Sequence, residues 1–155
     1  MARHRDATPG HATPRQAADI AALQSALAAE DAASYGYGVV GAHLSGAAFT
    51  LASADCVIHE RARDALFSMI TALGATPQPA AVAYRLPLAV STAAEAATLA
   101  VDLELDVVSG YVALAGAGAP ALRRLAATRM QDAATRAARW GGSPQAFPGL
   151  ARSRT

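Results

Sequence analysis

The segment ATPQPAAVAYRLPLAV, residues 75–90, decides how this chain folds. It contains Pro77, Pro79 and Pro87, and proline interrupts a helix because its ring removes a backbone donor and clashes with the preceding turn. Helical periodicity on both sides makes the segment a long connector between two helices. Extended chain spans about 3.3 Å per residue against about 1.5 Å in a helix, so this connector can cover the full length of a neighbouring helix.

Working outward from the connector, apolar residues recurring every three or four positions predict four helices. We expect them at residues 17–44, 50–73, 92–115 and 120–140. Gly74 is suited to end the second helix, and Pro120 fits the first turn of the fourth. Thr92 and Glu95 have the spacing of a capping box at the start of the third.

The connector lengths predict the topology. Short loops make the first two helices antiparallel, and likewise the last two, whereas the long connector lets the second and third run parallel. One long crossover in the middle of a bundle is the arrangement of ferritin-like folds, so the prediction is an all-α, ferritin-like four-helix bundle with its crossover between helices two and three. We expect a disordered arm at residues 1–16, the bundle at 17–150, where Phe147 and Leu150 dock the last segment, and a flexible tail at 151–155.

The composition agrees with a helical protein. Alanine is the most frequent residue and aromatic residues make up 5%, which favours helices that approach closely around a thin core. We expect Leu27, Leu66, Met69 and Trp140 to be the large residues of that core. The single cysteine, Cys56, excludes an internal disulfide framework and, with no apolar segment of a secretory signal near the start, predicts a cytoplasmic protein.

Charge is distributed unevenly along the chain. The net charge is +1, yet residues 107–155 hold seven arginines against Asp132 as their only acid. No aromatic or glycine-rich RNA motif accompanies these arginines, so we do not expect a nucleic-acid partner. Residues 32–54 contain no charged side chain, but His43 and a turn near Ser45 indicate a buried bundle helix, and we expect no membrane association.

Four stretches of the chain resemble a known family. They are AEDAASYGYGVVGAHL (residues 29–44), HERARDAL (59–66), AYRLPL (83–88) and ARWGGSPQAFPGL (138–150). Together they resemble an actinobacterial, alanine-rich family of ferritin-like domains of unknown function, its mycobacterial members especially. The resemblance covers about residues 17–150 and implies the bundle architecture, but it implies no established activity.

Ferritin-like di-iron proteins place one glutamate from each of two helices, and a Glu-x-x-His motif from each of the other two, in the bundle centre. Glu30 and Glu104 match the lone glutamates. The second helix offers His59, but Cys56 stands where the motif has its carboxylate. The fourth helix has no histidine, and its nearest candidates are Asp132 with the flanking Arg129 and Arg136.

This pattern leaves too few carboxylates for two irons, and arginine can supply the missing positive charge. A buried carboxylate without a partner costs several kcal/mol, so we expect guanidinium groups to replace the metal. The predicted polar core consists of Glu30, Tyr37, His59, Arg63, Glu104, Asp132 and Arg136. We expect no cofactor; the alternative is iron or manganese bound by Glu30, His59 and Glu104.

Two classes of function follow from these alternatives. The preferred one is a non-catalytic or degenerate ferritin-like domain that acts through its helix faces, as a homodimer formed by the first two helices or with a partner protein. The rival is a metal-dependent oxidoreductase that uses Glu30, His59 and Glu104 as ligands, with Asp132 as a fourth candidate. A third reading, binding of RNA or anions, requires Arg123, Arg124, Arg129 and Arg139 to form one exposed patch.

Overall fold

The computed structural model describes residues 12–143. This part of the chain contains four helices and no strand. Their bounds are α1 (Pro14–Ala42), α2 (Gly46–Ala72), α3 (Ala93–Ala115) and α4 (Pro120–Arg139). The arm and tail expected at the two ends, and the docking of Phe147 and Leu150, lie outside the described residues.

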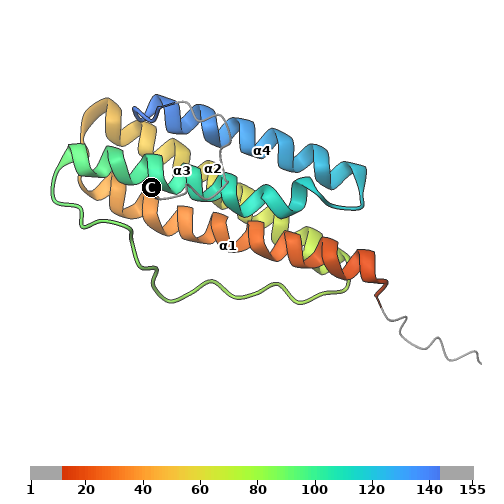
Figure 1. The fold of residues 1–155 in the computed structure, drawn as a ribbon. Coiled ribbons are helices and arrows are strands. Elements are labelled where there is room, and N and C mark those ends of the chain that lie inside the picture. Colours follow the sequence, from red (N-terminus) through yellow and green to blue (C-terminus); the bar gives the residue numbers. More distant parts are fainter. Residues whose placement is uncertain (1–11, 144–155) are drawn as a thin grey trace, which may run out of the picture.

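The four helices lie side by side along one axis, and the crossover runs the length of the bundle (Figure 1). Residues 43–45 join α1 to α2, so these helices are antiparallel. Residues 73–92 then return along the outside, which makes α3 start at the same end as α2 and run parallel to it. Helix α1 packs against α2 and α3, and α3 packs against α4.

Local sequence explains where the helices begin and end. Helix α1 starts three residues earlier than expected because the Thr13 hydroxyl accepts a hydrogen bond from the Gln16 backbone N–H and Pro14 follows as the first helical residue. Helix α2 starts at Gly46 rather than at residue 50, so the first loop is shorter than expected. The capping box of Thr92 and Glu95 is present at the start of α3.

Small residues allow α1 and α3 to approach closely. A Cβ atom at Gly36 would lie 2.5 Å from the Leu103 side chain, and one at Gly110 would collide with Ala29. Around this contact the core contains two apolar clusters. Leu27 and Leu66 are fully buried in it, whereas Met69 and Trp140, expected in the core, pack against it while partly exposed.

Side chains hold the crossover to the bundle. The Gln24 amide donates to the Thr76 carbonyl at 2.8 Å and accepts from the Gln78 backbone N–H at 2.9 Å. Farther along, Leu86 and Leu88 pack against the core. None of the helices between residues 12 and 143 has the length and apolarity that crossing a membrane requires.

Candidate functional site

Each helix contributes one buried charged side chain to the middle of the bundle. Glu30 comes from α1, His59 from α2, Glu104 from α3 and Arg136 from α4. The first three are at most 1% exposed and Arg136 is 7% exposed. With His59 protonated, two positive and two negative groups meet in a region from which water is excluded.

His59 bridges the two glutamates. Its Nδ1 lies 2.7 Å from Glu30 Oε2, and its Nε2 lies 3.2 Å from Glu104 Oε1. Burial by itself lowers the pKa of His59, but the hydrogen bonds to Glu104 and Glu30 outweigh it and raise the pKa to about 9. At neutral pH His59 is therefore an imidazolium that donates from both ring nitrogens.

Glu104 is the most heavily engaged acid. Its Oε1 accepts hydrogen bonds from the Tyr37 hydroxyl at 2.7 Å and from Arg136 Nε at 2.8 Å, in addition to His59. Burial raises the pKa of Glu104, yet the hydrogen bonds from His59 and Arg136 more than compensate, so the pKa is lowered and the group stays ionised. The other oxygen, Oε2, is buried and has no hydrogen-bond partner among residues 12–143.

Two tyrosines complete the network. Tyr111 donates to Glu30 Oε1 at 2.7 Å, and the Tyr37 ring stacks on the His59 ring with centroids 5.2 Å apart. Burial and the neighbouring carboxylates raise the pKa of both tyrosines, so both hydroxyls remain protonated donors. Each carboxylate thus receives one phenol hydrogen bond as well as its contact with His59.

A further buried acid, Asp55, lies outside this network and was not predicted from the sequence. Asp55 is 1% exposed; its carboxylate accepts from Arg139 at 2.7 Å and from the Trp140 indole N–H at 3.0 Å. The sequence did contain an indication of this position. Asp55 precedes His59 by four residues, about one helical turn, so the two side chains share one face of α2. These contacts fasten the C-terminal end of α4 to α2.

Two predicted core residues lie outside the network. Arg63 is bound to the neighbouring Asp64 at 2.9 Å near the surface, and Asp132 is exposed. The helix geometry explains both errors. Position 132 lies about 100° around α4 from the buried Ala133, and position 63 is on the edge of the buried face centred near His59.

The arginines near the end of the chain do not form one free patch. Arg123 donates to the carbonyls of Ala117 at 2.8 Å and Gly118 at 2.9 Å, which holds the loop between α3 and α4. Arg139 is bound to Asp55. Two of the four arginines that an RNA- or anion-binding surface requires are therefore engaged in holding the bundle together.

Most donor atoms of this network bind one another, and Glu104 Oε2 is the one buried side-chain oxygen left without a partner among residues 12–143. A histidine ligand must present a neutral ring nitrogen, but both nitrogens of His59 face carboxylates. The oxygen of Glu104 nearest His59 already accepts from Tyr37 and Arg136. Among residues 12–143, no three His, Cys, Asp or Glu side chains are grouped so as to hold a metal ion.

Comparison with known proteins places the chain in a family. Residues 22–152 match a domain of unknown function, DUF4439. The chain belongs to this DUF4439 family. The crystal structure of a conserved hypothetical protein, rv2844, from Mycobacterium tuberculosis is similar over 81% of this chain and 96% of that one, with 39% identity and a TM-score of 0.77. No match is found among curated proteins.

Proposed function

We propose that this DUF4439 domain is a ferritin-like bundle whose metal centre is replaced by an ion-pair network, and that it acts as a homodimeric scaffold or interaction domain. The chain order, with one long crossover between α2 and α3, supports the ferritin-like assignment. Glu30, His59 and Glu104 occupy positions that ligate metal in such folds. Here they bind one another.

The observation that carries this proposal is the charge balance around Glu104. His59 and Arg136 together supply two positive charges, which neutralise Glu30 and Glu104 without a metal ion. A bound divalent cation would add charge to a site that is already balanced, and it would have to displace Arg136 or deprotonate His59. The network therefore favours a structural role for these residues.

A homodimer is supported by the apolar side chains that α2 exposes. Phe49 is 49% exposed and Val57 is 39% exposed, and both line a shallow hollow of about 300 Å³ between α1 and α2. Gly38 and Gly41 form part of the α1 side of this hollow. Exposed apolar surface of this kind marks interaction sites, and these helices are the pair expected to form the interface.

One measurement separates the metal-free scaffold from the rival oxidoreductase. The full-length protein is purified and dialysed against a chelator, and its iron, manganese and zinc contents are determined by elemental analysis. We expect clearly substoichiometric metal and an unchanged melting temperature after chelation, since no metal-binding free energy is lost. Retention of about two irons per chain, as in the di-iron proteins of this superfamily, would contradict the proposal.

The unpartnered oxygen of Glu104 is the one observation that favours the rival. Oε2 is buried without a donor among the described residues, and a metal ion or a water molecule would satisfy it. A Glu104→Gln variant distinguishes the two roles. If Glu104 is a structural acceptor, the variant loses stability but its metal content stays at the wild-type level. If Glu104 is a ligand, bound metal is lost.

A further inference from the structure

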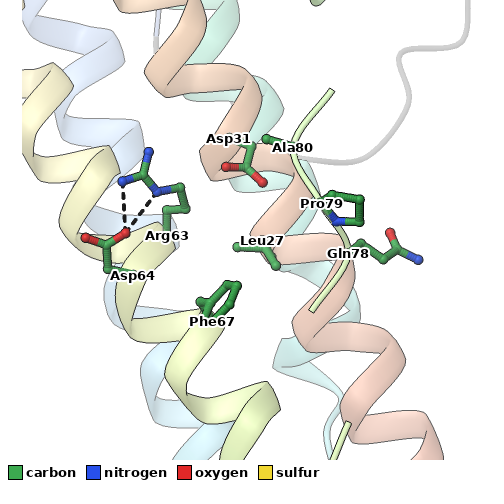
Figure 2. A pocket seen from close by; sticks show the side chains of 8 residues that line it. All are labelled: Leu27, Asp31, Arg63, Asp64, Phe67, Gln78, Pro79 and Ala80. Atoms are coloured by element: carbon green, nitrogen blue, oxygen red, sulfur yellow. Dashed lines mark hydrogen bonds and ion pairs between the residues drawn. The ribbon is translucent and has the colours of Figure 1, made fainter. Parts of the chain in front are cut away.

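A hollow lies between α1, α2 and the crossover, away from the polar core (Figure 2). It measures about 410 Å³. Its walls are formed by Leu27, Asp31, Arg63, Asp64, Phe67, Gln78, Pro79 and Ala80. Sites for small molecules commonly measure about 300–1,000 Å³, so this hollow is large enough for a small ligand.

Asp31 is the unusual member of this lining. It is 9% exposed, and among residues 12–143 no hydrogen bond or ion pair reaches its carboxylate. The other buried acids, Glu30, Asp55 and Glu104, all have donors. Burial raises the pKa of Asp31, with Arg63 opposing the shift. Both oxygens of Asp31 still reach water, and a ligand with N–H groups would supply the donors that the protein does not provide.

The remaining charges of the hollow cancel. Arg63 donates through both Nε and a terminal guanidinium nitrogen to the same oxygen of Asp64, at 2.9 Å in each case. This pair is neutral as a whole, so Asp31 gives the hollow a net negative charge. Figure 2 shows Asp31 at one end of the hollow, on the α1 side, and the Arg63–Asp64 pair across from it on α2.

The other end of the hollow is apolar. Leu27 lies next to Asp31 along the lining, and the Phe67 ring lies beyond it (Figure 2). Pro79 on the crossover forms the facing wall. Phe67 is 52% exposed, so the body of a bound ligand would cover apolar surface that the protein leaves open to water.

We infer that this hollow binds a small organic amine, whose ammonium group pairs with Asp31 and whose apolar body lies between Leu27, Phe67 and Pro79. This inference does not depend on the metal content or on the oligomeric state of the bundle. A primary ammonium could also come from the lysine side chain of a partner protein. The sequence contains no lysine, so a second copy of this chain offers no such side chain.

The test compares three probes by NMR titration of the full-length, isotope-labelled protein. 2-Phenylethylamine has both an ammonium group and an apolar ring. 2-Phenylethanol has the same ring but no charge. Nα-acetyl-lysine amide, here N-acetyl-lysine amide, has a free ε-ammonium group and represents a lysine side chain. We expect the amine to shift the backbone amides around Asp31 and Phe67 and to bind about tenfold or more tightly than the alcohol, since a charge-assisted hydrogen bond is gained. The lysine derivative should bind more weakly than the aromatic amine.

Three variants show which side chains contact the bound amine. Asp31→Asn should weaken binding of the amine by about 10- to 100-fold and leave the alcohol unaffected. Asp132→Asn, an exposed acid on α4, is the matched control and should change neither affinity. Phe67→Ala should weaken both probes, because each loses the same apolar contact.

Four outcomes would overturn the inference. Equal affinity for amine and alcohol would remove the role of Asp31, as would an Asp31→Asn variant that binds the amine like the wild type. Absence of amide shifts in the hollow up to the solubility limit of the amine would remove the site itself. Binding of N-acetyl-lysine amide as tight as that of the aromatic amine would replace the small molecule by a protein side chain as the ligand.

Discussion

His59 links the protonation state of the core to its stability. Its pKa is raised to about 9 by Glu104 and Glu30, against about 6.5 for histidine in an unfolded chain. Because the folded protein binds this proton more tightly, the stabilisation is complete below about pH 6.5 and is lost as the pH rises through about 9. The difference corresponds to about 3 kcal/mol in the free energy of unfolding.

Urea unfolding at a series of pH values from about 6 to 10 measures this effect. The wild-type free energy of unfolding should fall across the upper part of this range, while a His59→Gln variant, less stable at neutral pH, should show a flatter profile. Tyr37 stacks on His59, and the carboxylates of Glu30 and Glu104 flank it. A flat wild-type profile would mean that His59 is not protonated in the core.

Arg136 is the second cation of the network, and its removal tests the charge balance. Arg136→Met keeps most of the aliphatic stem but leaves Glu104 without its guanidinium partner. We expect a loss of about 3–5 kcal/mol, as for other buried ion pairs that lose one member. Arg124→Met, at an exposed position of α4, should change stability by less than about 0.5 kcal/mol.

A double variant shows whether the stability lost in Arg136→Met comes from the unpaired charge of Glu104. Adding Glu104→Gln to Arg136→Met removes the uncompensated negative charge, so the double variant should be more stable than Arg136→Met alone. Additive losses would instead indicate that the two residues contribute through packing and not through their charges. Both variants are compared by chemical unfolding at pH 7.

Helical periodicity explains which site residues could be predicted. Glu30, His59 and Glu104 follow the inward positions of their helices, so the sequence placed them toward the centre without knowledge of the packing. Arg63 and Asp132 were assigned wrongly because a periodic pattern fixes a helix face only to within about one residue, or 100°. Asp55 was missed because an acid among alanines resembles a solvent-exposed position until Arg139 and Trp140 are seen beside it.

At the scale of the helices, the contact between α1 and α3 depends on glycine. A Cβ atom at Gly110 would collide with Ala29 and lie 3.4 Å from the Ser25 carbonyl oxygen. We expect Gly110→Ala to destabilise the protein by about 1–3 kcal/mol, because overpacking between rigid helices outweighs the better helix propensity of alanine.

Gly38 on α1 provides the matched control for Gly110. Within one chain a Cβ atom there meets nothing within 4 Å, so Gly38→Ala should stabilise the monomer, studied in the Phe49→Asp background, by about 0.5–1 kcal/mol through helix propensity. Thermal unfolding of both variants measures the contrast. If both substitutions were stabilising to the same extent, the close approach of α1 and α3 would not be a constraint on the fold.

The helices themselves were largely predictable, and their ends less so. Gly74, Thr92 with Glu95, and Pro120 gave correct stops and starts, since each acts through local backbone chemistry. The start of α2 was placed four residues too late. Ser45 makes no side-chain capping hydrogen bond there, but the turn expected near Ser45 is the local signal that marks this boundary.

At the scale of the whole molecule, the proline-rich connector predicted the direction of the helices, but it did not predict the hollow that the connector forms with α1 and α2. Connector length allowed α2 and α3 to run parallel, as they do. The path of the connector across α1 depends on Gln24, whose amide binds Thr76 and Gln78. Periodicity contains no information about such a contact, so the hollow beneath the crossover could not be predicted.

Oligomeric state is the property that most directly tests the proposed scaffold role. Phe49 and Val57 are exposed on α2 beside a hollow lined by glycines of α1, and burying them against a second copy would remove apolar surface from water. We therefore expect light scattering at micromolar concentration to give twice the mass of one chain. Phe49→Asp should produce the monomer, because a carboxylate would be buried at the interface.

Val82→Asp is the control for the dimer experiment. Val82 lies on the crossover, is fully exposed and lies away from the hollow that contains Phe49, so its substitution should leave the dimer intact. Unchanged circular dichroism of both variants would exclude loss of the fold as the cause of dissociation. A monomeric mass for the wild-type protein would remove the homodimer, and the scaffold role would then require a different protein as partner on this face.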